Sequence, residues 1–400
     1  MKILVIHPTS NQNNRNLLIA LKKKGYLYKF ITIANFNTDK IIFKLLPKKL
    51  VNFLERRNFS KITSKIYTPS VISQIIYFIK SRFDKSFSTI KGYYYIDKIA
   101  ANYLNKNVKD IDAVYSYEDA ALETFKIAKK NNIKCIYELP IGHWKEKNKI
   151  LTSENKKYFQ NLNNIHTKHN YVEGYKKNLE LKLADQIIVP SKFVKNTLKK
   201  SNFNYKNIKI IPYGFNGALK RNNWSIKKSK RLKILFVGGL IPRKGLKYLL
   251  DAVKKINNTK KIVDLTIVGS GPLENFVKNK QNNINYIKSL PHNKILKLMR
   301  KNDIFILPTL YEGFALVLTE AMSNGMVVMS TNCTCLPEIT NGDDCIIIKT
   351  KNIKGIIDQI TKLNNNRMMI KKIGLNAIKT SKNYSWTDYQ KKIIQVLENE

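Results

Sequence analysis

Short apolar runs rich in β-branched residues alternate with amphipathic segments along the first half of the chain. These runs cover residues 2–8, 28–34, 111–117, 133–140 and 184–191. Strands that are apolar on both faces and are joined by helices are typical of parallel sheets with helices on both sides. The pattern therefore predicts an α/β domain with a parallel sheet.

The same alternation starts again after a polar and basic stretch, residues 216–231. The second series of runs covers residues 232–239, 264–271, 284–290, 303–310, 325–332 and 344–349. We therefore predict two Rossmann-like, doubly wound domains, residues 1–215 and 232–380, joined by the linker 216–231. Because ligands of such sheets bind beyond the carboxyl ends of the strands, two domains in tandem indicate a cleft between them.

Length and composition agree with this division. Four hundred residues, of which 43% are hydrophobic, suit two packed domains and exclude a disordered chain. Lys and Arg number 72 against 28 Asp and Glu, which gives a formal net charge of +44. Such a charge attracts nucleic acid, anionic lipid or phosphorylated substrates. Lys, Asn and Ile are abundant throughout, so a compositional bias also explains part of the excess, and charge alone selects no partner.

One segment, residues 41–82, breaks the alternation. It mixes aliphatic and aromatic residues with Lys and Arg and has almost no acids. At helical spacing this composition gives a basic amphipathic surface, for which two interpretations stay open. The segment either packs on the core with a solvated back or lies on an anionic membrane surface.

The cysteines and the N-terminus bear on the cellular compartment. Cys135, Cys333, Cys335 and Cys345 form no CxxC pair and have no histidine nearby, so reduced core thiols are favoured over a zinc site. The strand in MKILVIHPTSN stops too early for a signal peptide, and no apolar run approaches the ~20 residues that span a bilayer. We expect a cytoplasmic protein, soluble or peripheral on the inner face of the membrane.

Two acids, Glu312 and Glu320, stand at the two ends of the apolar segment GFALVLT. Glu312 follows the strand-like run 303–310, and Glu320 lies inside the helix predicted next. The simple interpretation is a solvated turn residue and an exposed helix position. The alternative is that the first amides of the helix bind a phosphate while the two carboxylates accept hydrogen bonds from hydroxyls of the same ligand.

Cations and glycines gather where the first two strands of the second domain end. VGGLIPRKG (237–245) leaves its strand through Gly238 and Gly239 and delivers Arg243 and Lys244 just before a helix. Adjacent cations beside a helix N-terminus form an anion site, although PRKG alone is also an ordinary basic turn. VGSGP (268–272), with Gly269, is a glycine turn after the next strand and by itself is weak evidence for a nucleotide.

Two histidines end strands of the first domain. His143, in YELPIGHWK, follows the run 133–140 and would face the cleft if the two domains oppose each other. His7, in IHPTSNQN, ends the first strand. For a lone histidine such as His143 a structural role is the alternative interpretation.

In their order and spacing, these motifs resemble a family 4 glycosyltransferase of the GT-B fold, across essentially the whole chain. The specific match is the E-x7-E pattern of Glu312 and Glu320 in EGFALVLTEAM, joined by FVGGLIPRKG, VGSGP, ADQIIVPSKFV and IPYGFN. The segment SWTDYQKKIIQVLEN, within residues 381–400, looks like the C-terminal helix that in this fold crosses back to the first domain.

The resemblance implies a nucleotide-sugar donor held mainly by the second domain, a saccharide or lipid-linked acceptor held mainly by the first, and retention at the anomeric carbon. Glu312 would contact the donor sugar, Glu320 the ribose, and His143 would lie near the transferred sugar. Arg243 and Lys244 would stabilise the leaving diphosphate. The other implied donor contacts are Gly238, Gly239, Gly269, Gly313, Phe314, Ala315, Leu316 and Val317. Neither a metal nor a cofactor is implied, because cations and helix amides neutralise the developing charge.

The chain departs from the family pattern in three places. Gly239 stands where relatives commonly carry an arginine, so Arg243 would take over its charge. HPTSNQNNR lacks the paired glycines that often approach the donor, so His7, Asn11 and Asn13 would serve as acceptor or loop contacts. Cys335 stands where relatives often show glycine.

We therefore expect a retaining glycosyltransferase that builds a cell-surface polysaccharide or glycolipid. A transferase to a soluble acceptor, of the sucrose-phosphate or glucan synthase type, is the alternative within the enzyme class. The net charge leaves a nucleic-acid-binding protein as a rival, although the sequence has no helix-turn-helix, zinc finger or aromatic RNP pattern, and no nucleic-acid partner is expected. An inactive scaffold is the third alternative, because of Gly239.

Overall fold

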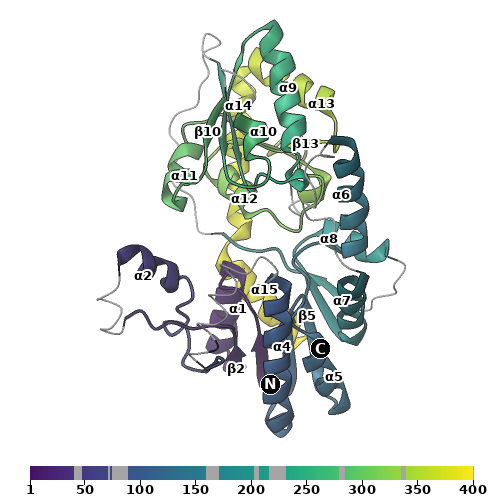
Figure 1. The fold of residues 1–400 in the computed structure, drawn as a ribbon. Coiled ribbons are helices and arrows are strands. Elements are labelled where there is room, and N and C mark those ends of the chain that lie inside the picture. The colour runs from purple at the N-terminus through teal and green to yellow at the C-terminus, as the bar shows by residue number, and fades with distance from the viewer. Residues whose placement is uncertain are drawn as a thin grey trace.

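Two parallel β-sheets, each covered by helices, form two lobes that lie one above the other (Figure 1). The structure is a computed structural model that describes residues 1–39, 47–70, 73, 89–158, 171–201, 207–215, 231–278, 284–334 and 339–399. The predicted α/β class with two Rossmann-like domains is confirmed.

The first domain contains a seven-stranded sheet in the order β3-β2-β1-β4-β5-β6-β7, with parallel neighbours. Its strands are β1 Ile3–Ile6, β2 Leu27–Ile31, β3 Ile66–Tyr67, β4 Ala113–Tyr117, β5 Lys134–Glu138, β6 Gln186–Val189 and β7 Ile208–Ile210. Its helices are α1 Gln12–Lys23, α2 Lys48–Glu55, α4 Thr89–Lys106, η2 Val108–Asp110, α5 Leu122–Lys130, α6 Trp144–Tyr158, α7 Tyr171–Leu183 and α8 Lys192–Lys199.

The second domain contains a six-stranded parallel sheet in the order β10-β9-β8-β11-β12-β13. Its strands are β8 Leu232–Val237, β9 Val263–Val268, β10 Ile284–Ile287, β11 Ile304–Leu307, β12 Val327–Thr331 and β13 Ile346–Ile348. Its helices are η3 Pro242–Lys244, α9 Leu246–Thr259, α10 Glu274–Lys278, α11 His292–Met299, α12 Leu316–Ser323, η4 Asn332–Thr334, α13 Ile353–Asn365, α14 Arg367–Ser381 and η5 Lys382–Tyr384.

The central strands are apolar because both faces of each sheet are covered. All residues of β1, β6, β11 and β12 are buried. In each sheet the chain moves outward from the first strand, then returns to its other side, so the direction of winding reverses between β1 and β4 and between β8 and β11. Ligands of open α/β sheets bind at such switch points, beyond the carboxyl ends of the strands.

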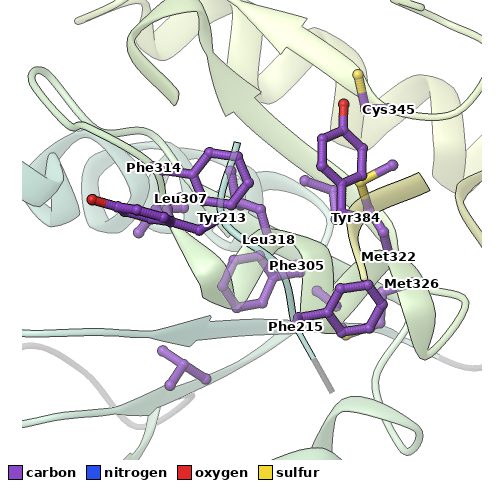
Figure 2. Close-up of a cluster of buried hydrophobic side chains, with 14 of the residues drawn as sticks. Tyr213, Phe215, Phe305, Leu307, Phe314, Leu318, Met322, Met326, Cys345 and Tyr384 are labelled. Atoms are coloured by element: carbon purple, nitrogen blue, oxygen red, sulfur yellow. The ribbon is translucent and has the colours of Figure 1, made fainter. Parts of the chain in front are cut away.

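The chain passes between the domains at two adjacent places. The Phe215 amide donates to the Tyr384 carbonyl at 2.9 Å, and Phe215 pairs with Ser385. The strands pack so closely here that a Cβ on Gly214 would lie 2.5 Å from the Trp386 nitrogen. Aromatic and sulfur-containing side chains from both domains fill the adjoining core (Figure 2). Of the predicted linker 216–231, only Arg231 is among the described residues.

The C-terminal helix α15, Trp386–Glu398, returns to the first domain and packs against α1. The Tyr26 hydroxyl donates to the Glu398 carboxylate at 2.7 Å, and Lys24 pairs with the same carboxylate at 2.8 Å. Gln390 donates to Asn16 at 2.8 Å. The predicted crossing helix is therefore confirmed, and it begins at Trp386.

Two sequence expectations fall partly outside the described residues. Of the segment 41–82, the structure describes residues 47–70 and 73, which include α2 but leave most of the expected amphipathic surface untested. Cys335 also lies outside, whereas Cys135, Cys333 and Cys345 are buried. No helix of the described chain is long and apolar enough to cross a membrane.

Candidate active site

The loops after β8 and β11 meet at the switch point of the second domain. The Leu310 amide donates to the Arg243 carbonyl at 2.8 Å, and the Thr309 hydroxyl donates to the same carbonyl at 3.0 Å. Gly245 has a φ of +69°, and a Cβ there would lie 1.9 Å from the Pro308 carbonyl oxygen. Only glycine fits this turn. The loop that carries the two cations is thereby fixed against the loop that carries Glu312.

Arg243, Lys244 and Glu312 form a partly buried ion-pair cluster between these loops. The Arg243 guanidinium lies 2.9 Å from the Glu312 carboxylate, and the Lys244 ammonium contacts the same oxygen. Burial alone would raise the pKa of Glu312, but Lys244 and Arg243 outweigh burial and lower it to about 2. Burial also lowers the pKa of Lys244, an effect that Glu312 partly offsets. Two cations thus share one carboxylate, which leaves an excess of positive charge for an anionic ligand.

The N-terminus of α12 lies directly after this cluster in the chain. Its N-cap, Ala315, makes no side-chain capping hydrogen bond. The amides of Leu316 and Val317 belong to the first turn, where the helix dipole is positive. Cations and helix amides together can bind a phosphate or diphosphate group, and such binding stays a prediction.

Glu320 lies in the second turn of α12, in a separate contact from Glu312. The His292 ring, at the start of α11, lies 2.9 Å from the Glu320 carboxylate. Burial raises the pKa of Glu320, and His292 opposes this effect. His292 is well exposed, so a ligand can reach the pair from solvent. His292 was not anticipated, because a lone histidine after a loop proline carries no recognisable signal.

The turns after β8 and β9 contain glycines that differ in whether packing requires them. A Cβ on Gly269 would lie 1.9 Å from the Gly238 carbonyl oxygen, so the turns after β8 and β9 touch through their backbones. A Cβ on Gly239 would meet nothing within 4 Å. Packing therefore requires glycine at Gly269 but not at Gly239.

Gly313 and Phe314, which were expected as donor contacts, also contact the first domain. A Cβ on Gly313 would lie 1.8 Å from the Pro140 carbonyl oxygen, and the Ser191 hydroxyl donates to the Gly313 carbonyl at 2.8 Å. Gly313 is thus a point of contact between the two domains. The Phe314 ring packs 5.7 Å from the ring of Tyr213, within the buried cluster of Figure 2. Only the backbone of Phe314 is left to contact a ligand.

His143 lies at the interface with the second domain. The Tyr311 hydroxyl, next to Glu312 in the chain, donates to the His143 carbonyl at 2.8 Å. The His143 Nδ1 accepts from the Lys145 amide at 3.4 Å, so Nε2 carries the proton and donates to the Asn178 side chain at 3.1 Å. Burial lowers the pKa of His143 to about 4, although Asn178 opposes this, and the ring is neutral at pH 7.

His7 and Asn13 are buried, and their role as acceptor or loop contacts stays a prediction. Both lie inside the first domain beside Glu138, which is completely buried. Asn13 donates to Glu138 at 2.6 Å, and the His7 Nε2 lies 3.8 Å away. Burial lowers the pKa of His7 to about 3, so this contact is not an ion pair. Asn11 caps α1 by accepting from the Asn14 amide at 3.2 Å.

Glu138 was missed because its partners are far apart in the sequence. Besides Asn13, it accepts hydrogen bonds from Tyr213 at 2.8 Å and from Tyr115 at 3.1 Å. Burial raises the pKa of its carboxyl group, and these hydrogen bonds oppose that effect. The only available signal was an acid within the apolar run IKCIYELP.

A second buried charge cluster follows β4 in the first domain. Lys177 lies 2.7 Å from both Glu118 and Asp119. Burial opposes the charge on Lys177, but the two carboxylates raise its pKa above the usual value. Asp119 has a φ of +71°, which is unusual for a residue with a side chain. The pair ED in YSYEDA was the only sequence signal for this cluster.

The comparisons with known proteins first define a class. The fold is GT-B: the structure of HepE from Anabaena in complex with UDP superposes with a TM-score of 0.67 at 15% identity, over 100% of both chains. At that identity the likeness shows the fold alone.

Matches in sequence then add a more specific likeness, to glycosyltransferases. Residues 220–380 match the family model described as glycosyl transferases group 1. An uncharacterized glycosyltransferase of Methanocaldococcus jannaschii is 32% identical over 210 residues, 51% of this chain and 56% of that protein. The Escherichia coli UDP-Gal:α-D-GlcNAc-diphosphoundecaprenol α-1,3-galactosyltransferase is 30% identical over 171 residues, 40% of this chain and 43% of that protein. These matches span about half the length of the relatives.

Proposed function

We propose that this protein is a glycosyltransferase that moves a sugar from a nucleotide-sugar donor to a saccharide or lipid-linked acceptor, in the synthesis of a cell-surface polysaccharide or glycolipid. The observation that carries the proposal is the partly buried cluster of Arg243, Lys244 and Glu312 beside the uncapped N-terminus of α12. Both lie at the switch point of the second sheet, where α/β domains bind nucleotides. The match of residues 220–380 to glycosyl transferases supports it.

The proposed reaction retains the configuration at the anomeric carbon, as in family 4. Arg243, Lys244 and the first amides of α12 hold the donor diphosphate and stabilise the charge that develops when the sugar leaves. Glu312 then exchanges its ion pair for hydroxyls of the donor sugar. Glu320 exchanges its hydrogen bond with His292 for hydrogen bonds with the ribose. His143, being neutral, stands near the transferred sugar without adding positive charge beside the developing cation.

No metal or cofactor is needed in this proposal. Within the described residues, no group of three or more His, Cys, Asp or Glu is arranged to hold a metal ion. The cations and amides supply the electrostatic stabilisation that a metal would otherwise give. We expect turnover to be unchanged in excess EDTA, and a requirement for added Mg²⁺ or Mn²⁺ would contradict this part of the proposal.

The first experiment is a thermal-shift panel of UDP, GDP, ADP and TDP with the full chain. UDP is expected to stabilise most, because the HepE structure contains UDP and the Escherichia coli relative is named for a UDP-sugar. Ligand at a hundred times its dissociation constant stabilises by about 2.7 kcal/mol. Salt-sensitive DNA binding without binding of any nucleoside diphosphate would favour the nucleic-acid rival instead. Diphosphate binding without turnover would favour an inactive scaffold.

We further propose that the protein is cytoplasmic and works on the inner face of the membrane through residues 41–82. Cosedimentation with anionic and neutral liposomes tests this. Each lysine near an anionic surface contributes about 1 kcal/mol, so binding should fall as salt rises. Equal binding to anionic and neutral vesicles would remove the electrostatic basis of the idea.

A further inference from the structure

A cavity of about 720 Å³ lies between the two domains and is lined by residues of both. Its size is in the range of ligand pockets, about 300–1,000 Å³. The first domain contributes α6 and α8, and the second contributes residues that follow β11, β12 and β13. Tyr311 lines the cavity and also donates to the His143 carbonyl, so the cavity adjoins the site described above. Arg243, Lys244, Glu312 and Glu320 do not line it.

Positive charge is concentrated on one wall of this cavity. Lys192 and Lys199 lie on one face of α8, Lys200 directly follows the helix, and all three are exposed. Across the described residues, none of these three lysines has a salt-bridge partner. Lys351 also lines the cavity, but it pairs with Glu154 at 2.6 Å. Among the described residues lining the cavity, Glu146 is the one acid. Lys192, Lys199 and Lys200 are therefore available to an anionic ligand.

The remaining surface combines aromatic rings with neutral hydrogen-bonding groups. The Phe193 ring is partly exposed, and it packs edge to face at 5.2 Å on the ring of Tyr311, which is fully buried behind it. Asn196, Thr197 and Asn332 add amide and hydroxyl groups. Aromatic rings offer an apolar surface to the C–H faces of sugars, and amides bond sugar hydroxyls. Cations, rings and amides in one cavity suit a saccharide that carries acidic groups.

We propose that this cavity binds an anionic saccharide, a segment of the acceptor that carries carboxylate or phosphate groups. The proposal rests on the proposed function, because it names the class of acceptor. Since the cavity wall comes from both domains, a bound saccharide contacts both and stabilises their closed arrangement. The lysines of α8 thus select an acidic acceptor, whereas Arg243 and Lys244 serve the donor.

Calorimetry with the full chain tests the proposal at about 0.15 M salt, where exposed charges beyond about 8 Å are screened. The probes are a hyaluronan tetrasaccharide for carboxylates, maltotetraose with a terminal phosphate for phosphates, and neutral maltotetraose as the control. At least one acidic probe should bind about tenfold or more tightly than the neutral one. Equal or absent binding of all three, in protein that binds UDP, overturns the cavity assignment and leaves the proposed function standing.

Two double variants with the same change of charge locate the binding. Lys199→Glu with Lys200→Glu should weaken the acidic probe about tenfold or more. The control is Lys371→Glu with Lys372→Glu, on exposed positions of α14 away from the cavity. It should change the affinity for the acidic probe by less than about twofold. UDP should bind both variants as it binds the wild type. An equal loss in the two variants would mean diffuse attraction to the net charge and would overturn the proposal.

A third variant separates the cavity from its charged rim. Asn196→Trp, at an exposed position of α8, fills part of the cavity without changing the charge. Binding of the acidic probe should weaken, while UDP binding and the melting temperature should stay near the wild-type values. Undiminished binding of the acidic probe would place the saccharide outside the cavity. If the wild-type protein does not bind UDP, that result would instead count against the proposed function.

Discussion

At the residue scale, the two acids of the E-x7-E pattern have different partners. Glu312 is held by Arg243 and Lys244, which are the residues expected to bind the diphosphate. Glu320 is held by His292, on another element. Glu312 therefore competes with an anionic ligand for the two cations, whereas Glu320 does not. This difference gives each acid its own expected signature.

Glu320→Gln should raise KM for the donor and spare kcat, because the ribose does not change during the reaction. The bare nucleoside diphosphate should also bind more weakly. Glu312→Gln should lower kcat, because it acts where positive charge develops. It should leave diphosphate affinity equal or higher, because the competing carboxylate is gone. Calorimetry of UDP against both variants is the measurement, and the opposite pattern would reverse the assigned roles.

Arg243→Ala should lower kcat by roughly a hundredfold, the usual cost of losing one preorganised electrostatic contact. Because a side chain on Gly239 would enter open space, Gly239→Arg should be tolerated and should partly rescue Arg243→Ala. Steady-state kinetics of the two single variants and the double variant form the test. Full activity of Arg243→Ala would show that Arg243 does not replace the cation that relatives carry at this position.

At the element scale, the sequence predicted what depends on local pattern. The long apolar runs became strands near their expected bounds: the run 303–310 contains β11, and the run 325–332 contains β12. The sequence did not predict β3 and β7, because strands of two or three residues are too short to show a periodic pattern. Contacts made by folding were also missed, among them Glu138 with Tyr213 and Lys177 with Glu118. Such pairs join positions that no local motif connects.

Ser385→Ala should destabilise the protein by about 1 kcal/mol, the typical cost of an N-cap. Ser385 and Asp388 form a capping box at the start of α15, in which the Ser385 hydroxyl accepts from the Asp388 amide at 3.1 Å. Thr259→Ala, at the exposed end of α9, removes a comparable hydroxyl and should stay within about 0.5 kcal/mol. Urea denaturation compares them. Equal stability of the two variants would mean that α15 needs no cap.

At the scale of the whole molecule, specific hydrogen bonds join the two domains in addition to their shared apolar core. Tyr311 donates to His143, and Ser191 donates to the Gly313 carbonyl. Glu154 of α6 accepts from Tyr248 of α9 at 2.8 Å. The first two contacts hold the loop that carries Glu312 against the first domain. We therefore expect closure of the domains to assemble the site.

Gly313→Ala should separate the domains, because its Cβ would lie 1.8 Å from the Pro140 carbonyl oxygen. We expect a larger radius of gyration by small-angle scattering and a kcat lower by about tenfold or more. UDP affinity should change little, because its proposed contacts lie in the second domain. Gly239→Ala, which meets nothing within 4 Å, is the control for scattering. An unchanged radius in Gly313→Ala would show that the interface adapts.

The return of α15 also constrains the order in which the protein is made. Tyr26 bonds Glu398, 372 positions later in the chain. At about 5–20 residues per second, a ribosome needs roughly 20 to 70 s to cover that distance. Until α15 is made, the surface of α1 that it covers has no partner. The whole second domain is synthesised in that interval. The first domain is thus synthesised first but completed last, when α15 packs on it. Nascent chains should therefore depend on chaperones that bind exposed apolar helices.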